Sequence, residues 1–374
     1  MSGTRRGSKE TLYVTLQDVA ALAGVSAKTV SRVVNNQGEI KESTRQRIQA
    51  AIDELDYHPN ILARSLIRQR TNTLAVVAWG IDYFGPSQSI IGIEEQAEEL
   101  GYSLLLSLVS EAEHHDQERI LDTLLARRVD GIIWAVPDVG DNRRWLSTAA
   151  LEDLPPIVFL SMSAQAGVTA VAVDNRSGAA HVAQHLIQQG RSKFGIITGP
   201  MAWWEARERY AGWTQALADA GLSVPQQRVT ESYWSAAGGE KAMQRLLENE
   251  PDLDAVCAGS DQIALGALGA IHASGRSVPD DIAVVGFDDM PEAEYFWPPL
   301  TTVCQKLASV GRTAVQQLHQ MIGARREGQT DAPAAVTMIQ PELVVRASSV
   351  KGAAPSWPPG NQVAGKPRSG FAQA

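Results

Sequence analysis

The chain has 374 residues, too many for one hydrophobic core and enough for a small N-terminal domain followed by two α/β lobes. Residues 1–70 carry 11 Lys and Arg against 7 Asp and Glu, a net of +4, whereas the other residues carry 22 against 35, a net of −13. A basic segment ahead of an acidic body is typical of a DNA-binding domain joined to a small-molecule sensor. No apolar run approaches the ~20 residues of a membrane span, and no apolar secretion segment opens the chain, so we expect a cytoplasmic protein without a membrane partner.

The N-terminal segment has the pattern of a helix-turn-helix. Thr15 and Asp18 have the spacing of a capping box, and small apolar residues follow up to Gly24, which can supply the positive φ of a turn. Ser26 is a suitable N-cap for a second helix. The apolar positions of the two helices are spaced to bury one face, and they are Val19, Ala20, Ala23, Val25, Val30 and Val33. Together with a third helix at residues 42–55, they predict an all-α domain at residues 12–58, after a disordered basic stretch at residues 1–11.

The polar side of the second helix carries residue types that read DNA. Ala27, Lys28 and Arg32 project from its early turns, and Lys or Arg can donate to O6 and N7 of guanine in the major groove. Around them lie polar side chains that suit the contacts positioning a protein on DNA, namely Thr15, Ser26, Thr29, Ser31 and Asn35. An ordinary helical hairpin with a solvated polar face would show the same helix-Gly-helix pattern, so further features have to separate the two interpretations.

A short hinge helix is expected between the N-terminal domain and the body, within residues 59–72. Pro59 stops the third helix, and Asn60 can cap a short helix that ends at Leu66 and has Ala63 on its apolar side. A helix this short is unstable alone in water. We therefore expect it to become ordered against a copy of itself on DNA and to insert an apolar side chain into the minor groove. A plain interdomain linker would also fit these residues.

The body alternates apolar strand segments with amphipathic helices. The strands read as continuous apolar runs, as parallel strands covered on both faces do, and are expected at residues 74–78, 103–108, 131–136, 157–161, 170–173, 194–198, 255–258 and 282–287. Helices are expected between most of them, among others at residues 90–100, 116–128, 178–189 and 205–220. This alternation predicts doubly wound parallel α/β sheets. Cys257 and Cys304 lie in apolar segments and are expected to be reduced core residues, without a disulfide or a metal.

Polar and aromatic side chains follow several strands, at the edge where parallel sheets bind ligands. They are Tyr83, Pro86, Ser89, Asp138, Glu205, Arg209, Ser260 and Asp288, with Trp234 on a loop. Sugars are bound by this mixture, because hydroxyls pair with charged groups and the apolar faces of sugar rings stack on aromatic side chains. Asp261 and Asp289 also follow strands, and we interpret them as structural caps. We find no catalytic or nucleotide-binding motif, so we expect neither an enzyme nor a cofactor or metal.

The N-terminal motif is specific enough to indicate a family. It reads T-L-Q-D-V-A-A-L-A-G-V-S-x-x-T-V-S-R-V-V-N and is followed by Y-x-P-N-x-x-A-x-x-L. The chain thereby resembles the lactose/galactose repressor family over about residues 14–346. The resemblance implies a DNA-reading headpiece, a hinge helix and a two-lobed effector-binding core similar to periplasmic binding proteins.

The resemblance also implies where the lobes begin and end. Lobe 1 would comprise residues 73–172 with about 301–328, and lobe 2 residues 173–300 with about 329–347. A disordered tail rich in Pro and Gly would follow at residues 348–374.

Single residues receive roles from the same resemblance. E-A-R-E-R-Y-A-G-W places Arg209 on the effector-binding arginine, and S-Y-W-S places Trp234 on the stacking tryptophan. G-F-D-D places Asp288 on the effector-binding aspartate. L-T-T-V-C-Q-K-L places Gln305 between the lobes, and G-P-S-Q-S places Pro86 in the pocket.

The DNA-binding positions and two departures also follow from the resemblance. Ala27, Lys28 and Arg32 fall on base-reading positions, and Leu66 falls on the hinge leucine that enters the minor groove. Ala27 and Lys28 differ from the reading pair of the family member with the most similar pattern, so the operator sequence need not match. Ser260 stands where that member has Asn, which weakens one sugar contact.

We therefore expect a homodimeric regulator of transcription, a repressor that binds double-stranded operator DNA and is controlled by a small carbohydrate, a galactoside, between the lobes. A purine or a protein corepressor stays open as the effector, and a sugar-binding protein without a regulatory role is a more remote alternative. The tail lacks the leucine heptads that assemble tetramers, so we expect assembly to stop at the dimer.

Overall fold

The computed structural model describes residues 14–35, 37–58, 70–112, 117–146, 151, 153–329 and 335–352. The chain divides between Thr71 and Asn72 into two compact units. The first unit contains the helix-turn-helix segment and the second the acidic body, and each has hydrophobic cores of its own.

The described residues of the first unit form three helices, as predicted. Its helices are α1 (Leu16–Ala23), α2 (Ala27–Val34) and α3 (Glu42–Glu54). Gly24 ends α1 with a φ of 63°, a left-handed conformation in which a side chain would be strained. The fully buried side chains of Val19, Val30 and Ile48 bring one residue from each helix into the small core.

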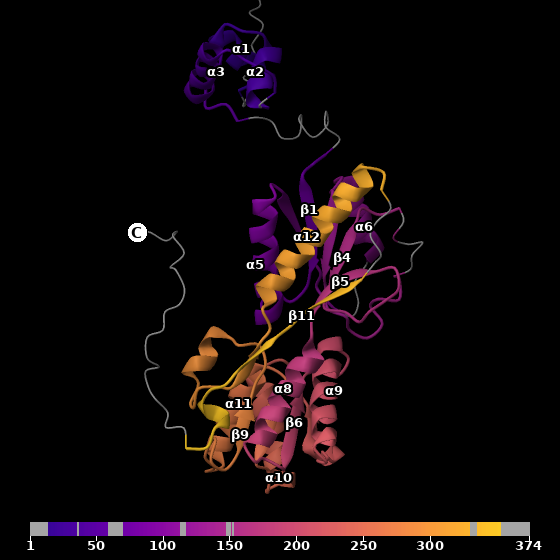
Figure 1. Cartoon of the computed structure of the whole chain (residues 1–374), viewed down its shortest axis with the longest axis vertical. Helices are drawn as coiled ribbons and strands as arrows, with labels where there is room; N and C mark the ends of the chain where they lie inside the picture. Colours follow the sequence, from indigo (N-terminus) through magenta and orange to yellow (C-terminus); the bar gives the residue numbers. More distant parts are fainter. Residues whose placement is uncertain are drawn as a thin grey trace, which may run out of the picture. The chain divides into compact units, whose positions relative to one another are not determined.

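The first lobe of the second unit is a six-stranded parallel sheet with helices on both faces (Figure 1). The strand order is β11-β5-β4-β3-β1-β2. The strands are β1 (Thr73–Ala78), β2 (Ser103–Leu108), β3 (Gly131–Ala135), β4 (Ile157–Leu160), β5 (Thr169–Val173) and β11 (Val336–Ile339). Helices α5 (Phe84–Glu99) and α12 (Leu307–Arg326) cover one face, and α6 (Gln117–Ala126) packs against the other. Alternate residues of β1 enter the two cores, because successive side chains of a strand point to opposite faces.

Two glycines bring α5 and α12 into close contact. A Cβ on Gly92 would lie 2.0 Å from the carbonyl oxygen of Ala308, and one on Gly311 would lie 2.1 Å from that of Ser89. A side chain at either position would push the helices apart. This contact fixes the N-terminal half of α5, which carries Ser89 and Pro86.

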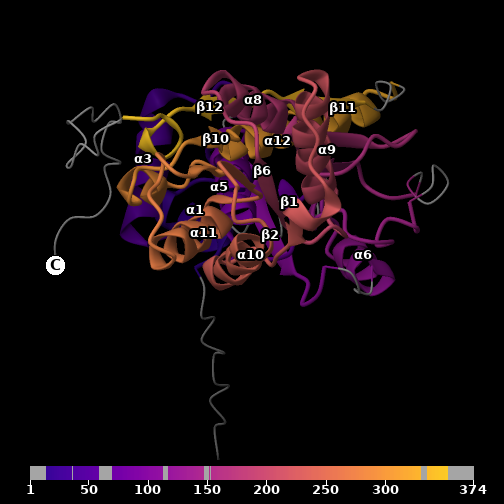
Figure 2. The ribbon, with the colours of Figure 1, turned by 90° about the horizontal axis from the view of Figure 1, so that it is seen from below.

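The second lobe is a four-stranded parallel sheet in the order β7-β6-β8-β9. Its strands are β6 (Phe194–Thr198), β7 (Val229–Glu231), β8 (Ala255–Ala258) and β9 (Ala283–Val285). In Figure 2, α8 (Asn175–Gln188) and α9 (Trp204–Asp219) lie on one side of β6, and α10 (Ala236–Asn249) and α11 (Asp261–Ala273) lie on the other. The 3-10 turns η1 (Gln226–Arg228) and η2 (Pro291–Tyr295) complete the lobe. The expected doubly wound, two-lobed core is therefore confirmed.

Three connections join the lobes, and the third one corrects an expected boundary. The chain passes between the lobes after β5, again between β10 (Thr302–Cys304) and α12, and finally between β11 and β12 (Glu342–Val344), which pairs antiparallel with β10. We expected residues 329–347 in the second lobe, with a crossing near Gly328. This boundary is wrong, because β11 pairs with β5 in the sheet of the first lobe and the chain crosses only after Ile339.

The start of the expected disordered tail is also wrong. Ser348 and Ser349 are fully buried in the 3-10 turn η3 (Ala347–Ser349). The hydroxyl of Ser348 donates to the carbonyl oxygen of Val284 at 2.6 Å and accepts from the N–H of Thr301 at 2.8 Å. The hydroxyl of Ser349 lies 2.8 Å from Nε2 of His185. These bonds tie the segment to the second lobe; the tail from residue 353 onward lies outside the described residues.

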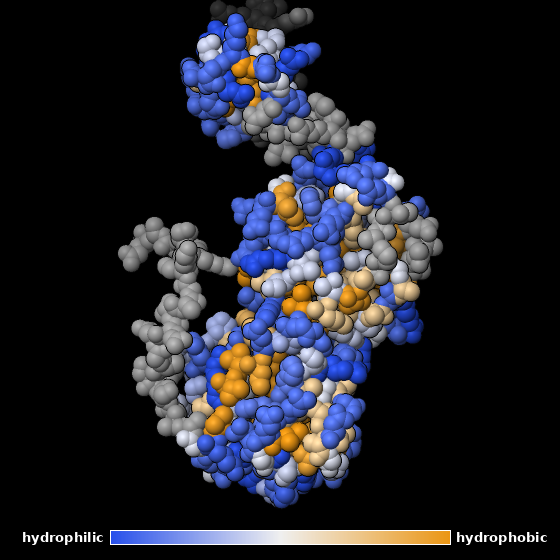
Figure 3. All heavy atoms as spheres, in the orientation of Figure 1, coloured by the Kyte–Doolittle hydropathy of each residue, from blue (hydrophilic) through white to orange (hydrophobic). Residues whose placement is uncertain are grey.

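The surface in Figure 3 is mostly hydrophilic, and apolar side chains gather on it in separate patches. Within the described ranges, no helix is long and apolar enough to cross a bilayer. Leu106 and Leu108 are among the exposed large apolar side chains, and both lie on β2, the edge strand of the first sheet. An apolar edge strand of this kind is a typical place for a second protein chain to pack.

Candidate functional sites

Two side chains predicted to bind DNA also start the helices of the helix-turn-helix. The Thr15 hydroxyl oxygen accepts from the N–H of Asp18 at 3.4 Å, and the Asp18 carboxylate accepts from the N–H of Thr15 at 2.8 Å. The hydroxyl and N–H of Thr15 also lower the pKa of Asp18. Ser26 caps α2 in the same manner by accepting from the N–H of Thr29 at 3.2 Å. Thr15 and Ser26 are nevertheless exposed, so each can meet a phosphate as well.

The two cationic residues proposed to read bases lie on the open face of α2. Lys28 and Arg32 are both exposed and lie one helical turn apart, opposite the buried side chains of Val30 and Val33. The other predicted residues of this helix are half-buried beside them and are Ala27, Thr29, Ser31 and Asn35. The predicted hinge residues Asn60, Ala63 and Leu66 lie outside the described residues.

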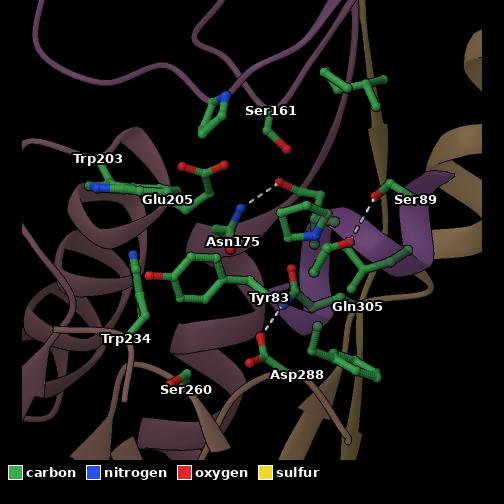
Figure 4. Close-up of a pocket in the computed structure, with 18 of the residues that line it drawn as sticks. Tyr83, Ser89, Ser161, Asn175, Trp203, Glu205, Trp234, Ser260, Asp288 and Gln305 are labelled. Atoms are coloured by element: carbon green, nitrogen blue, oxygen red, sulfur yellow. Dashed lines mark hydrogen bonds between the residues drawn. The ribbon is translucent and has the colours of Figure 1, made fainter. Parts of the chain in front are cut away.

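The second candidate site is a cavity between the two lobes of the core, of about 960 Å³ including its open mouth (Figure 4). Nine of the ten predicted effector-binding residues line it, namely Tyr83, Pro86, Ser89, Glu205, Arg209, Trp234, Ser260, Asp288 and Gln305. The tenth, Asp138, does not line the cavity. Its buried carboxylate lies 3.4 Å from both the backbone nitrogen and the hydroxyl of Ser163, so it braces two loops of the first lobe instead.

Arg209 is the centre of a buried polar network in this cavity. Its Nε donates to Oδ1 of Asn175 at 2.8 Å, and its Nη1 donates to the carbonyl oxygen of Gly259. Its Cζ lies 3.9 Å from the centre of the Phe287 ring, and its Nη1 lies 3.7 Å from Oδ1 of Asp288. These contacts hold the planar guanidinium in one orientation, which suits directed hydrogen bonds to a ligand.

Asp288 lies beside this arginine in an unusual backbone conformation. Its φ is 136°, a region that residues other than glycine rarely adopt and that is often found at functional sites. The side-chain amide of Gln305 donates to its carboxylate (Figure 4). Burial raises the pKa of Asp288 to about 7, although Arg209 acts in the opposite direction. The carboxyl group therefore changes protonation near neutral pH.

Glu205 places a second carboxyl group in the cavity. It lies in the first turn of α9 and faces Ser161, which follows β4 in the first lobe and has a φ of 51°. Burial raises the pKa of Glu205 to about 7, while Arg209 and a hydrogen bond from Ser161 oppose that shift. Its Oε2 is buried and has no hydrogen-bond partner among the described residues.

Four aromatic rings form a continuous series across the two lobes. The ring of Tyr83 stacks on that of Trp79 with 5.4 Å between centres. Trp79 meets Trp203 edge-on at 5.3 Å, and Trp203 meets Trp234 edge-on at 5.9 Å. Three of these rings line the cavity, those of Tyr83, Trp203 and Trp234, and they offer apolar faces for stacking.

Asn175 and Ser161 are polar residues of the cavity that sequence reasoning missed. Asn175 begins α8 two residues after β5 ends, and Ser161 directly follows β4. The rule that parallel sheets bind ligands beyond the carboxyl ends of their strands would have found both residues.

The two aspartates interpreted as structural caps do not line the cavity. Asp261 accepts hydrogen bonds from the hydroxyl of Thr302 and, at 2.8 Å, from the N–H of Met290. Asp289 forms an ion pair with Arg346 at 2.8 Å. These bonds hold the loop after β9 against β10 and the chain after β12, which agrees with the structural interpretation.

The cavity thus combines two carboxyl groups, a guanidinium, amides, hydroxyls and aromatic faces. Such a set can bind a polar, hydroxylated ligand that also has an apolar face. The described residues contain no cluster of His, Cys, Asp and Glu that could hold a metal ion.

Comparisons with known proteins match both parts of the chain. Residues 15–60 match the model for bacterial regulatory proteins of the lacI family, and residues 183–349 match the periplasmic binding protein-like domain. The chain is 34% identical to the lactose operon repressor of Escherichia coli over 308 residues, which cover 82% of this chain and 84% of that protein.

Two solved structures extend the likeness to the fold. A lac repressor dimer bound to operator and the anti-inducer ONPF superposes with a TM-score of 0.80 at 32% identity, covering 90% of this chain and 99% of that one. A complex of the transcriptional regulator CelR with cellobiose gives a TM-score of 0.66 at 32% identity, with the same coverage. The chain therefore belongs to the lacI family of bacterial regulatory proteins and is a DNA-binding regulator of transcription, not an enzyme.

Proposed function

We propose that this regulator is a repressor that releases its operator when a galactoside binds in the cavity between the core lobes. The observation that carries the proposal is the network of Arg209, Asp288 and Gln305, which lies in a cavity that both lobes line. A ligand held there would favour one arrangement of the lobes over another, and a difference in affinity between two arrangements is what shifts their populations.

The DNA side of the proposal rests on α2. Arg32 and Lys28 read base edges in the major groove, and Ala27 is small enough to let the helix approach them. Thr15, Ser26, Thr29, Ser31 and Asn35 contact phosphates, while the hinge with Asn60, Ala63 and Leu66 kinks the centre of the operator. The protein acts in the cytoplasm, where its operator lies.

A homodimer fits the pseudo-palindromic operator that this mode of binding requires. Leu106 and Leu108 expose apolar side chains on the edge strand β2, and Leu125 exposes another on α6. The similar lac repressor structure is itself a dimer. We propose that these two elements, with α5, form the dimer interface and that assembly stops there.

The galactoside proposal rests on the chemistry of the cavity. Arg209 and Asp288 offer paired charged groups to neighbouring hydroxyls, and Trp234 offers a ring face to the apolar side of a pyranose. Tyr83 and Pro86 close the side formed by the first lobe. A glucoside is the second candidate, because a similar regulator was solved with cellobiose.

Calorimetric titration of the full-length protein tests this assignment. The ligands are galactose, lactose, cellobiose and, for the purine alternative, adenine. We expect lactose or galactose to bind and cellobiose and adenine to bind at least tenfold more weakly. Binding of cellobiose or adenine in preference to both galactosides would overturn the galactoside assignment.

A further inference from the structure

The cavity has a carboxyl group at each end. In Figure 4, Asp288 lies near Ser260 at one end, Glu205 lies near Ser161 at the other, and Tyr83 is drawn between them. The two carboxyl groups come from different elements, since Glu205 is on α9 and Asp288 follows β9. A ligand that fills the cavity therefore meets two separate hydrogen-bond acceptors.

The carboxyl groups at the two ends differ in the hydrogen bonds that they receive from the protein. Asp288 receives a hydrogen bond from Gln305 and lies against Arg209. Arg209 also donates to Asn175 and to the Gly259 carbonyl, and it attracts the carboxyl group of Glu205 without donating a hydrogen bond to its Oε2. At the other end, Oε2 of Glu205 is buried with no hydrogen-bond partner in the described part of the chain. A buried carboxylate oxygen without a donor is costly, and a ligand donor would remove that cost.

Two charged residues behind Glu205 act on it with opposite sign. The charge of Asp138 disfavours ionisation of Glu205. The attraction between Glu205 and Arg143 favours the charged forms of these two groups. Arg143 is buried and donates to the carbonyl oxygen of Val136. Neither residue lines the cavity, so the carboxyl of Glu205 is the charged group of this trio that faces the cavity.

Backbone hydrogen bonds join the two lobes beside the Glu205 end of the cavity. The N–H of Trp204 donates to the carbonyl oxygen of Asp138 at 3.0 Å. The N–H of Gly140 donates to the carbonyl oxygen of Ala202 at 3.1 Å. These bonds bring the two lobes into contact next to Glu205, so a ligand group bound at this end lies close to its carboxyl group.

We propose that Glu205 selects ligands by charge: its carboxylate accepts a hydrogen bond from a hydroxyl at this end of a bound sugar and excludes ligands that carry a phosphate or carboxylate there. The inference rests on the proposed sugar-binding function. Hydrogen bonds to a charged acceptor are stronger than those between neutral groups, whereas two anionic groups held close together repel each other. Glu205 is thus a specificity-determining residue for uncharged, hydroxylated ligands.

Matched sets of sugars test this selection by calorimetry at about pH 8, above the raised pKa of about 7, so that Glu205 is ionised. The neutral members are galactose, glucose, lactose and cellobiose, and the anionic members are the uronates and 6-phosphates of galactose and glucose. Wild type is expected to bind at least one neutral sugar and to bind the matching anions at least tenfold more weakly. Glu205→Gln is expected to weaken the neutral sugar about tenfold and to reduce the discrimination against its anionic relatives. Glu240→Gln, an exposed change on α10, is the matched control and should behave as wild type.

A second variant separates charge from shape. Glu205→Asp keeps the negative charge on a shorter side chain, so it should lose affinity for the neutral sugar while still rejecting the anions. The inference fails if wild type binds an anionic sugar as tightly as its neutral counterpart, if Glu205→Gln keeps the wild-type selectivity, or if no neutral sugar binds. Binding of a neutral sugar that is not a galactoside would contradict the galactoside assignment and leave the role of Glu205 intact.

Discussion

The ring of Trp234 occupies the space in which a side chain on Gly199 would begin: a Cβ added to Gly199 would lie 2.1 Å from Cη2 of that ring. Gly199 directly follows β6, and Trp234 lies just before α10. The tryptophan can therefore pack over the end of β6 and face the cavity because residue 199 has no side chain.

Substitution of Gly199 by Ala should displace this ring. We expect overpacking to lower the free energy of unfolding of the core by about 1–3 kcal/mol and to weaken sugar binding at the same time. Gly269→Ala is the matched control, because Gly269 lies in the interior of α11 with no atom within 4 Å of its added Cβ. That change should stabilise the protein by about 0.5–1 kcal/mol and leave binding unchanged. Urea unfolding measures the stability of each variant, and calorimetry measures its sugar binding. Equal changes in stability and binding in the two variants would contradict the packing role of Gly199.

Removal of the Arg209 side chain should be costly for stability as well as for binding. The side chains of Arg209 and Asp288 are only 6% and 13% exposed, so Arg209→Ala leaves a buried carboxyl group without its cation. We expect a loss of about 3–5 kcal/mol in the free energy of unfolding, and no effector binding even where the protein remains folded. The pair of exposed Arg176 and half-buried Glu208 provides the comparison, and Arg176→Ala should cost less than about 1 kcal/mol. A loss of similar size in both variants would argue against the buried network.

The stability of the core should depend on pH through Glu205. Burial raises its pKa from 4.5 to about 7, so the unfolded chain ionises at lower pH than the folded one. The stability gained by keeping this carboxyl neutral is present below about pH 4.5 and is lost as the pH rises through about 7. Asp288, whose pKa is also raised to about 7, contributes in the same direction.

Comparison of wild type with Glu205→Gln isolates the contribution of Glu205. Glutamine does not ionise, so the stability of wild type relative to the variant should fall as the pH rises across this window. Urea unfolding of both proteins between about pH 4 and 8 measures the difference. A constant difference in the free energy of unfolding would show that the pKa of Glu205 is not raised in the folded state.

The capping box should stabilise the helix-turn-helix unit. Thr15→Ala removes the hydroxyl that accepts from the N–H of Asp18, and we expect a loss of about 1 kcal/mol. Lys41, the N-cap residue of α3, makes no side-chain capping bond, so Lys41→Ala should change stability by less than about 0.5 kcal/mol. Thermal unfolding followed by circular dichroism compares the two variants, and equal melting temperatures would remove the capping argument.

The long apolar runs of the sequence predicted the sheets well. The bounds expected for β2 and β6 match those of the structure, because each is a run of apolar residues between turns. The short strands β7, β10, β11 and β12 were missed, since each has only three or four residues and forms by pairing with a distant segment. The boundary at Gly328 was wrong for the same reason, because the sequence does not show that β11 returns to β5.

The candidate cavity could be predicted in large part because its residues follow strands. The error at Asp138 arises from a loop whose path cannot be read from spacing, since its carboxylate turns toward Ser163. The positive φ angles of Ser161 and Asp288 are likewise properties of the folded chain, because serine and aspartate do not by themselves predict a positive φ. Ser348, which we placed in a disordered tail, is buried through hydrogen bonds that leave no apolar pattern in the sequence.

Sugar bound in the cavity should lower the affinity for the operator, and bound operator should lower the affinity for the sugar. One thermodynamic cycle tests this coupling most directly. An operator obtained by in vitro selection is titrated with the protein at a stated salt concentration, with and without saturating sugar, and the sugar is titrated with and without operator. We predict that the sugar weakens operator binding about 5- to 150-fold and that the operator weakens sugar binding by the same factor. Equal operator affinity with and without bound sugar would contradict the account.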